Sequence, residues 1–196
     1  MINGMAIAIC YLIGSLSFSL IVGKIKGIDI RKHGSGNAGA TNTLRVLGIV
    51  PAIIVFVLDM GKGIASVLIG SWLSQGTLWV TAACGLAAII GHNWPVFFSF
   101  RGGKGIATTI GVTAVLSFYP AAIAGAVAII SIFITRYVSL GSLIFTTLMP
   151  IIAVIMGAEI EIIIAMLLIC AFAVYRHRSN IRRLIRGEEH KIGSKR

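Results

Sequence analysis

Seven long apolar stretches occupy most of this 196-residue chain, and they limit its fold more than any other feature. An α-helix needs about 20 apolar residues to cross the hydrocarbon core of a membrane, with a lower limit of about 17. The composition agrees, because 57% of the residues are hydrophobic and only 12% are charged. The sequence therefore predicts an all-α polytopic membrane protein, a bundle of seven transmembrane helices near residues 3–23, 47–73, 76–91, 105–119, 121–135, 140–157 and 160–175.

The basic residues predict how these helices are oriented. The net charge is +11, and the Lys and Arg residues gather in alternate connections and in the tail from Arg176 to Arg196. The other connections, near 74–76, 117–120 and 157–161, contain no Lys or Arg. Because cytoplasmic loops carry the excess of positive charge, this pattern predicts an amino terminus outside and a carboxyl terminus in the cytoplasm. The positive charge is thereby explained by topology, and we expect no binding to nucleic acid.

The chain is expected to form one integral membrane domain over residues 1–196, because no linker divides it. The first apolar segment lacks a basic stretch and a clear cleavage signal, so it is predicted to stay in the protein as a helix. Three isolated cysteines and few inward-facing acidic residues predict no metal site and no cofactor.

Two glycine-rich runs stand in the predicted inward connections, at residues 34–42 and 101–105. Glycine lets backbone N–H groups converge, and a following helix adds its positive dipole end, so each run suits a phosphate group. Tight turns alone would explain either run singly, but two runs on one membrane face predict a protein that binds two phosphates. The predicted ligand-binding residues here are Gly34, Ser35, Gly36, Asn37, Gly39, Asn42, Arg45, Gly102, Gly103, Lys104 and Gly105.

A pair of opposite charges lies inside the second predicted span. Asp59 and Lys62 stand three residues apart, on one face of a helix. Each charge alone would cost about 2.5–3.5 kcal/mol at the bilayer centre, so we expect them to pair or to meet other polar groups. A structural ion pair and a catalytic role remain equally open at this point. His92, at the end of the third span, is interpreted as a hydrogen-bonding turn residue.

A third polar constellation, residues 175–183, begins where the seventh span leaves the membrane. His177 and Asn180 are its candidate functional residues, whereas its arginines are typical of a segment attracted to anionic lipid headgroups. Ser142, near the start of the sixth span, is predicted either to contact a ligand or to cap the helix. The chain contains neither a Gly-x-Ser-x-Gly elbow nor a Walker-type Gly-Lys-Ser/Thr sequence.

Together these motifs resemble the bacterial acyl-phosphate:glycerol-3-phosphate acyltransferases, integral membrane enzymes that begin phospholipid synthesis. The resemblance covers essentially the whole chain, in the same motif order and spacing. It is carried by residues 34–42 with Arg45, Asp59 to Gly63, Gly91-His92 with Pro95, Gly102 to Gly105, and Arg176-His177 with Asn180-Ile181.

The resemblance implies that a fatty acyl group passes from acyl phosphate to the 1-hydroxyl of glycerol 3-phosphate, giving lysophosphatidic acid and phosphate. It implies a site that faces the cytoplasm from the bacterial cytoplasmic (inner) membrane. The expected partners are acyl phosphate, glycerol 3-phosphate and membrane lipids, and the oligomeric state is left open. A small-anion transporter is the alternative, and a lipid transferase dependent on CoA or a nucleotide is a third, lesser hypothesis.

We expect the acyl phosphate to bind against the first run, with Ser35 and Asn37, and glycerol 3-phosphate to bind against Lys104, Arg45 and residues 175–183. The expected catalytic residues are Ser35, Asn37, Arg45, Lys104, His177 and Asn180. An acyl phosphate is already activated, so positioning and charge stabilisation suffice and no covalent acyl-enzyme is required. The hydroxyl proton passes either to His177, oriented by Asn180, or to an oxygen of the acyl phosphate. We favour the second route, because no carboxylate is predicted to orient the imidazole.

Overall fold

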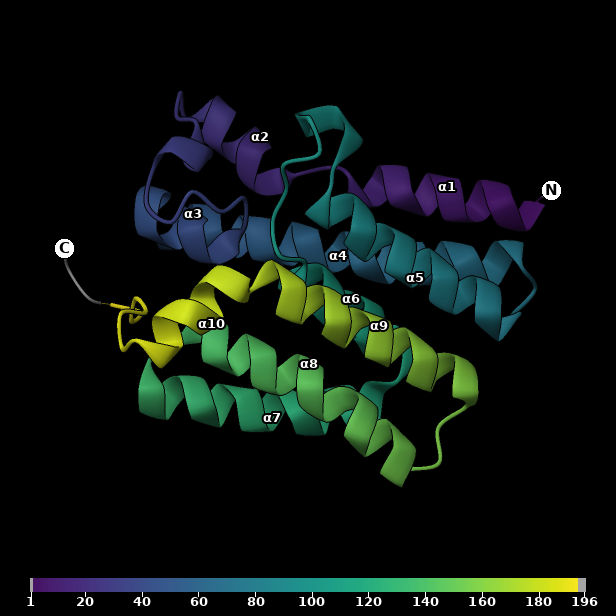
Figure 1. Cartoon of the computed structure of the whole chain (residues 1–196). Helices are drawn as coiled ribbons and strands as arrows, with labels where there is room; N and C mark the ends of the chain where they lie inside the picture. Colours follow the sequence, from purple (N-terminus) through teal and green to yellow (C-terminus); the bar gives the residue numbers. More distant parts are fainter. Residues whose placement is uncertain (1, 194–196) are drawn as a thin grey trace. The chain divides into compact units, whose positions relative to one another are not determined.

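The computed structural model describes residues 2–193, which form helices and loops without a strand among them (Figure 1). The predicted all-α class is confirmed. The contacts divide the chain into two compact units, residues 1–116 and 117–196. The single domain expected over residues 1–196 stays a prediction.

The first unit is built on three long helices, which pack against one another: α1 (Ile2–Gly14), α4 (Ile49–Leu73) and α5 (Leu78–Asn93). Shorter elements complete it: α2 (Phe18–Ile25), η1 (Ile30–Lys32), α3 (Ala40–Leu47), η2 (Val96–Phe98) and α6 (Ile106–Leu116). Small residues allow the close crossings, as helices in lipid require. A Cβ at Gly14 would overlap the backbone of Ala88, and one at Gly63 would overlap the carbonyl oxygen of Thr108.

The first apolar segment, predicted as one helix over residues 3–23, is broken in the structure. Helix α1 ends at Gly14 and α2 begins at Phe18, after Ser17 as its N-cap. Ser15 turns its hydroxyl back to the carbonyl oxygen of Tyr11, at 2.9 Å. The Ser15 hydroxyl shares this oxygen with the Ser15 backbone N–H, also at 2.9 Å, and back-bonding of this kind bends helices. The hydropathy continues through the break.

The second unit consists of four helices: α7 (Phe118–Thr135), α8 (Val138–Ile155), α9 (Ile160–Arg176) and α10 (Arg178–Ile185). Helix α8 packs against both α7 and α9. Helices α9 and α10 meet at His177, where the chain bends by 63°. The last span therefore ends in a short, strongly basic helix.

Five helical segments among the described residues are long and apolar enough to cross a membrane, and the bent pair α9–α10 would make a sixth. These segments match six of the seven predicted spans. The remaining predicted span, the fourth in chain order at residues 105–119, corresponds to helix α6, which has only 11 residues. At about 1.5 Å per residue α6 covers roughly half of a hydrocarbon core about 30 Å thick. The structure thus confirms a polytopic helical protein, while the count of seven spans stays a prediction.

Candidate active site

The first glycine run is held in shape by the side chain of Asn42. Its Oδ1 accepts a hydrogen bond from the Ser35 backbone at 2.8 Å, and its Nδ2 donates to the carbonyl oxygens of Ile30 and His33 at 3.0 and 3.1 Å. Asn42 is buried, so its side chain holds the backbone of the run from the protein interior. Gly34 is required above it, because its φ is +60° and a Cβ would overlap Asn42 Oδ1. The side-chain amide of Asn42, predicted to bind ligand, makes its hydrogen bonds within the loop.

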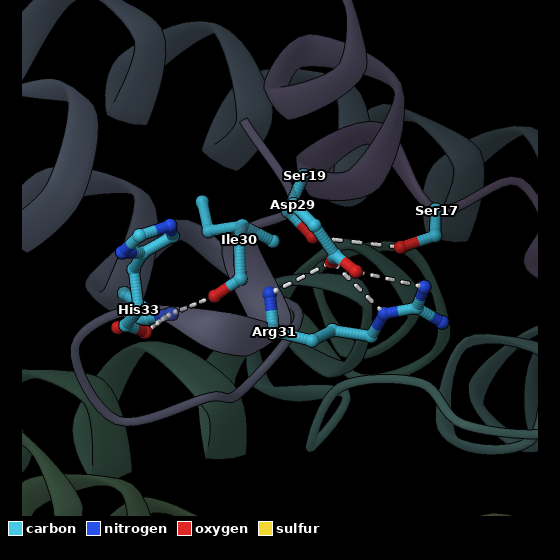
Figure 2. Close-up of polar contacts among 7 residues, drawn as sticks. Ser17, Ser19, Asp29, Ile30, Arg31 and His33 are labelled. Atoms are coloured by element: carbon cyan, nitrogen blue, oxygen red, sulfur yellow. Dashed lines mark hydrogen bonds and ion pairs between the residues drawn. The ribbon is translucent and has the colours of Figure 1, made fainter. Parts of the chain in front are cut away.

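The chain just before this run is fixed by Asp29 and Arg31 (Figure 2). Asp29 caps η1 by accepting a hydrogen bond from the Arg31 backbone, and its carboxylate also accepts from the Arg31 guanidinium, through Nε at 3.1 Å. These hydrogen bonds from Arg31 lower the pKa of Asp29 below its ordinary value. The same pairing directs Arg31 toward Asp29.

The remaining polar residues of the first run lie closer to solvent. Ser35 and Arg45 are exposed, while Asn37 is half-buried. Gly36 continues the turn after Ser35, and Gly39 is the N-cap of α3, as the predicted helix start requires. A Cβ at Gly39 would come within 3.2 Å of Asn37 Nδ2, so the Asn37 side chain lies against this cap. The run thus presents hydroxyl and amide donors beside the first turn of α3, while Arg45 lies in the last turn of that helix.

The second run wraps around the end of α5. The Gly103 backbone donates a hydrogen bond to the carbonyl oxygen of His92 at 3.1 Å, and a Cβ at Gly102 would overlap the same oxygen. Gly105, with φ +80°, packs against the side chain of Asn93 and leads directly into α6. Lys104 is half-buried between these glycines. Here too the predicted glycine run precedes a helix start.

The two runs meet at Gly103. A Cβ on this residue would overlap both the carbonyl oxygen of Ala38, in the first run, and Nε2 of His92. Only a residue without a side chain lets these three groups converge. The two predicted phosphate-binding runs are therefore in contact within the first unit. We call this contact between Ala38, His92 and Gly103 the seam.

Beneath the seam lies a buried charge cluster formed by Asp59, Lys62 and His92, whose exposed fractions are 1%, 5% and 4%. Lys62 Nζ lies 2.8 Å from Asp59 Oδ1 and 3.0 Å from His92 Nδ1. It also donates to the Leu16 carbonyl oxygen at 2.6 Å, in the break between α1 and α2. The expected pairing of Asp59 with Lys62 is observed. The interpretation of His92 as a simple turn residue missed this contact, because its partners are distant in the sequence.

In the second unit, His177 ends α9 and precedes α10. Its Nδ1 lies 2.8 Å from the carbonyl oxygen of Ala173. A carbonyl oxygen only accepts, so Nδ1 carries the hydrogen, and in the neutral ring Nε2 then holds the lone pair. No carboxylate was predicted to orient the imidazole, and the backbone carbonyl of Ala173 orients it instead. This tautomer is the one that a general base at Nε2 requires.

Glu189 is a residue of this unit that sequence reasoning passed over. Its carboxylate accepts hydrogen bonds from Asn180 at 2.7 Å, Ser139 at 2.9 Å and Arg183 at 2.8 Å. Burial alone would raise the pKa of Glu189, but hydrogen bonds from Asn180, Arg183 and Ser139 together hold it below its ordinary value. The signal available in the sequence was that Glu189 is one of few acidic residues in a basic tail. Asn180, predicted to orient His177 or substrate, donates to this carboxylate.

Ser142 does not cap α8. The N-cap is Tyr137, and the Ser142 hydroxyl donates to the carbonyl oxygen of Val138 at 2.8 Å within the helix. The capping alternative was therefore wrong, because the helix begins one turn earlier than that role requires. The other alternative, contact with a ligand, stays a prediction.

The fold and these runs define a class of protein: a polytopic helical membrane protein in which two glycine-rich loops, each followed by a helix start, contact one another. The family model described as "Glycerol-3-phosphate acyltransferase" matches residues 4–187. The chain belongs to this family, and the predicted family is confirmed.

Relatives and solved structures agree with this assignment. Glycerol-3-phosphate acyltransferases of Shouchella clausii and Halalkalibacterium halodurans are 57% and 53% identical, each over 94% of this chain and 93% of the relative. The crystal structure of PlsY (YgiH), an integral membrane glycerol 3-phosphate acyltransferase, in its glycerol 3-phosphate form is similar with a TM-score of 0.93 at 38% identity, over 97% of this chain and 96% of that chain. Its lysophosphatidic acid form has a TM-score of 0.90 at the same identity, over 97% and 95%.

Proposed function

We propose that this chain transfers a fatty acyl group from acyl phosphate to the 1-hydroxyl of glycerol 3-phosphate, releasing inorganic phosphate and leaving lysophosphatidic acid in the membrane. The observation that carries the proposal is the seam, where the two glycine runs meet in the first unit. A reaction between two phosphate-bearing substrates needs two anion sites side by side. Family membership supports the same reaction.

The residues of the first run are assigned to the acyl phosphate. Ser35 and Asn37 stand beside the N-terminus of α3, where hydroxyl, amide and backbone N–H groups stabilise negative charge on the departing phosphate. Asn42 is assigned a supporting role, because its hydrogen bonds shape the run. Gly34, Gly36 and Gly39 let the backbone follow this path.

The residues of the second run are assigned to glycerol 3-phosphate. Lys104, set between glycines at the start of α6, supplies positive charge to the phosphate, and Arg45 of α3 supplies a forked guanidinium. The 1-hydroxyl oxygen attacks the acyl carbon, a new C–O ester bond forms, and the C–O bond of the mixed anhydride breaks with phosphate as leaving group. Positioning and charge stabilisation are sufficient for such an activated donor.

The hydroxyl proton has two competent acceptors, an oxygen of the acyl phosphate and Nε2 of His177. The tautomer set by the Ala173 carbonyl supports His177 as a base. The substrate oxygen needs no group on the protein, and we retain it as the preferred route. The pH profile described below separates the two.

The choice of acyl donor tests the proposed reaction directly. Purified protein is given glycerol 3-phosphate with palmitoyl phosphate, palmitoyl-CoA or palmitoyl carrier protein, and lysophosphatidic acid and orthophosphate are measured. We expect equal amounts of the two products with palmitoyl phosphate alone. Product with palmitoyl-CoA but not with palmitoyl phosphate would refute the proposal. Flux of unchanged glycerol 3-phosphate into liposomes, without product, would support the transporter instead.

We further propose that the chain lies in the bacterial cytoplasmic membrane with α6 as a short seventh crossing, the amino terminus outside and both glycine runs facing the cytoplasm. The basic connections and tail support this orientation. Single cysteines at Lys32 and Arg101, both exposed, can be labelled with a reagent that does not cross membranes. We expect both to react from the cytoplasmic side only. Reaction from opposite sides would contradict the orientation.

A further inference from the structure

The charge cluster beneath the seam contains more acceptors than an ion pair needs. An ammonium group has three N–H donors and no acceptor. Lys62 Nζ has three acceptor atoms within 3.0 Å: the carbonyl oxygen of Leu16, Oδ1 of Asp59 and Nδ1 of His92. The carboxylate of Asp59 stabilises the ammonium charge, and the break between α1 and α2 supplies the carbonyl. The third partner is Nδ1 of His92.

This arrangement determines which nitrogen of His92 carries the hydrogen. Because Lys62 donates to Nδ1, that nitrogen must hold a lone pair, and the neutral ring carries its hydrogen on Nε2. A hydrogen on Nδ1 would make two donors face each other at 3.0 Å. Asp59 Oδ1 also lies near Nδ1 but is farther away, at 3.5 Å, than Lys62 Nζ at 3.0 Å. The Lys62 contact therefore selects the Nε2–H tautomer.

The hydrogen on Nε2 lies where the two glycine runs meet. A Cβ at Gly103 would overlap both this nitrogen and the carbonyl oxygen of Ala38. From the other side, the Gly103 backbone donates to the His92 carbonyl at 3.1 Å. His92 thus contacts the second run through both its ring and its backbone. Its ring orientation is set by Lys62, from a different helix.

We propose that Asp59, Lys62 and His92 form a positioning cluster, in which Lys62 holds His92 as the Nε2–H tautomer so that the seam keeps residues 102–105 in the conformation that receives glycerol 3-phosphate. The expected effect of the cluster on glycerol 3-phosphate binding rests on the function proposed above. The tautomer of His92 is independent of that function. None of the three is a catalytic residue. They act on the substrate through the second glycine run.

The tautomer is tested by nitrogen-15 NMR of the full-length protein in detergent, with labelled histidine. The signal of His92 is assigned by its loss in His92→Gln, since the chain has 4 histidines. We expect a protonated Nε2 and an unprotonated Nδ1, and we expect Lys62→Met to abolish that preference. A protonated Nδ1 in the wild type, as the other tautomer or as the imidazolium, would overturn the proposal even if the enzyme is active.

The kinetic test separates positioning from simple structural support. Glutamine places an amide nitrogen near the position of Nε2, whereas asparagine reaches only the position of Nδ1. His92→Asn should raise the KM for glycerol 3-phosphate by about tenfold, the upper end of the effect of one lost hydrogen bond between neutral groups at Nε2, and His92→Gln should recover part of it. The KM for palmitoyl phosphate and kcat should change little. Equal changes in both KM values and in kcat would contradict a role confined to the second run.

Lys62→Met leaves a carboxylate buried without its partner, so that variant can fail to fold. The double variant Asp59→Leu/Lys62→Met removes both charges and should fold, because apolar pairs replace buried ion pairs without loss of stability. We expect it to raise the KM for glycerol 3-phosphate as His92→Asn does. A folded double variant with the wild-type KM would overturn the proposal. Ser66→Ala is the matched control on the same helix, since its hydroxyl donates to the backbone carbonyl oxygen of Lys62, at 2.8 Å.

If the wild type transfers no acyl group from palmitoyl phosphate, the proposed function fails while the NMR test of the cluster still stands. If the wild type is active and the NMR spectrum shows a protonated Nδ1 on His92, the cluster proposal fails alone. The two proposals are therefore separable.

Discussion

The carbonyl oxygen of Ala38 and the α-carbon of Gly103 approach so closely that no side-chain carbon fits between them. This contact joins two loops that are far apart in the sequence. It makes the proposed acyl-phosphate and glycerol 3-phosphate surfaces neighbours, so that one phosphate-bearing substrate can be held beside the other.

Gly103→Ala should reduce activity by about tenfold or more. Its Cβ must displace Ala38 or His92, and overpacking of this kind typically costs about 1–3 kcal/mol. The measurement is lysophosphatidic acid formation from palmitoyl phosphate. Gly61→Ala is the matched control, because nothing lies within 4 Å of a Cβ there, and it should keep wild-type activity. Equal activity of the two variants would show that the seam tolerates a side chain.

Ser35→Ala and Asn37→Ala should each lower kcat by about 100- to 1,000-fold, the usual effect of removing one donor that stabilises developing negative charge. The protein should remain folded, because Ser35 is exposed and its backbone, rather than its hydroxyl, bonds to Asn42. Initial rates with saturating palmitoyl phosphate provide the measurement. Thr77→Ala, at the turn between α4 and α5, serves as the control. Near-normal rates in both site variants would remove the first run from the reaction.

His177→Asn tests the proton acceptor. If Nε2 of His177 takes the hydroxyl proton, the wild-type rate rises with pH as the imidazole loses its charge, and the variant lacks that limb near neutral pH. If an acyl phosphate oxygen takes it, the variant keeps the shape of the profile. We expect the shape to be kept. The measurement is kcat/KM for glycerol 3-phosphate over pH 5 to 9, a window of roughly two units on either side of neutrality.

Glu189→Gln should destabilise the protein by about 1–3 kcal/mol, because Arg183 loses its charged partner and the hydrogen bonds of Asn180 and Ser139 weaken. The midpoint of thermal unfolding in detergent measures this. Glu188→Gln is the control, since the side chain of Glu188, the residue next to Glu189, is exposed. An unchanged midpoint in Glu189→Gln would contradict the structural role of this carboxylate.

The pKa of Glu189 also predicts how stability depends on pH. Its pKa in the folded protein is below the ordinary value of 4.5, so its contribution is fully present above that value. That contribution is lost as the pH falls through the lower folded value, because the carboxylate must then be protonated. The thermal midpoint of the wild type should therefore approach that of Glu189→Gln in acid. A constant difference between them from pH 7 down to about pH 3 would refute this.

Much of the architecture was predictable because the relevant signals are local. Six of the seven predicted spans correspond to helical segments that satisfy length and hydropathy, or to the bent pair α9–α10. Both glycine runs lead into helix starts, at Ala40 and at Ile106. The break in the first helix was missed, because the hydropathy continues across it, and the hydrogen bond from the Ser15 hydroxyl to the Tyr11 carbonyl oxygen is visible only in the structure.

The sequence alone determined which segments are apolar enough to enter a membrane, and where the backbone can converge on an anion, because span length and glycine content are properties of short stretches. Only the tertiary structure decided that Ala38 meets Gly103, that Lys62 reaches both Leu16 and His92, and that Asn42 bonds to its own loop. The contacts of Ala38 with Gly103 and of Lys62 with its partners join segments that are separate in the chain, and their meeting depends on how the helices pack. The hydrogen bonds of Asn42 depend on the conformation that its loop adopts in the fold.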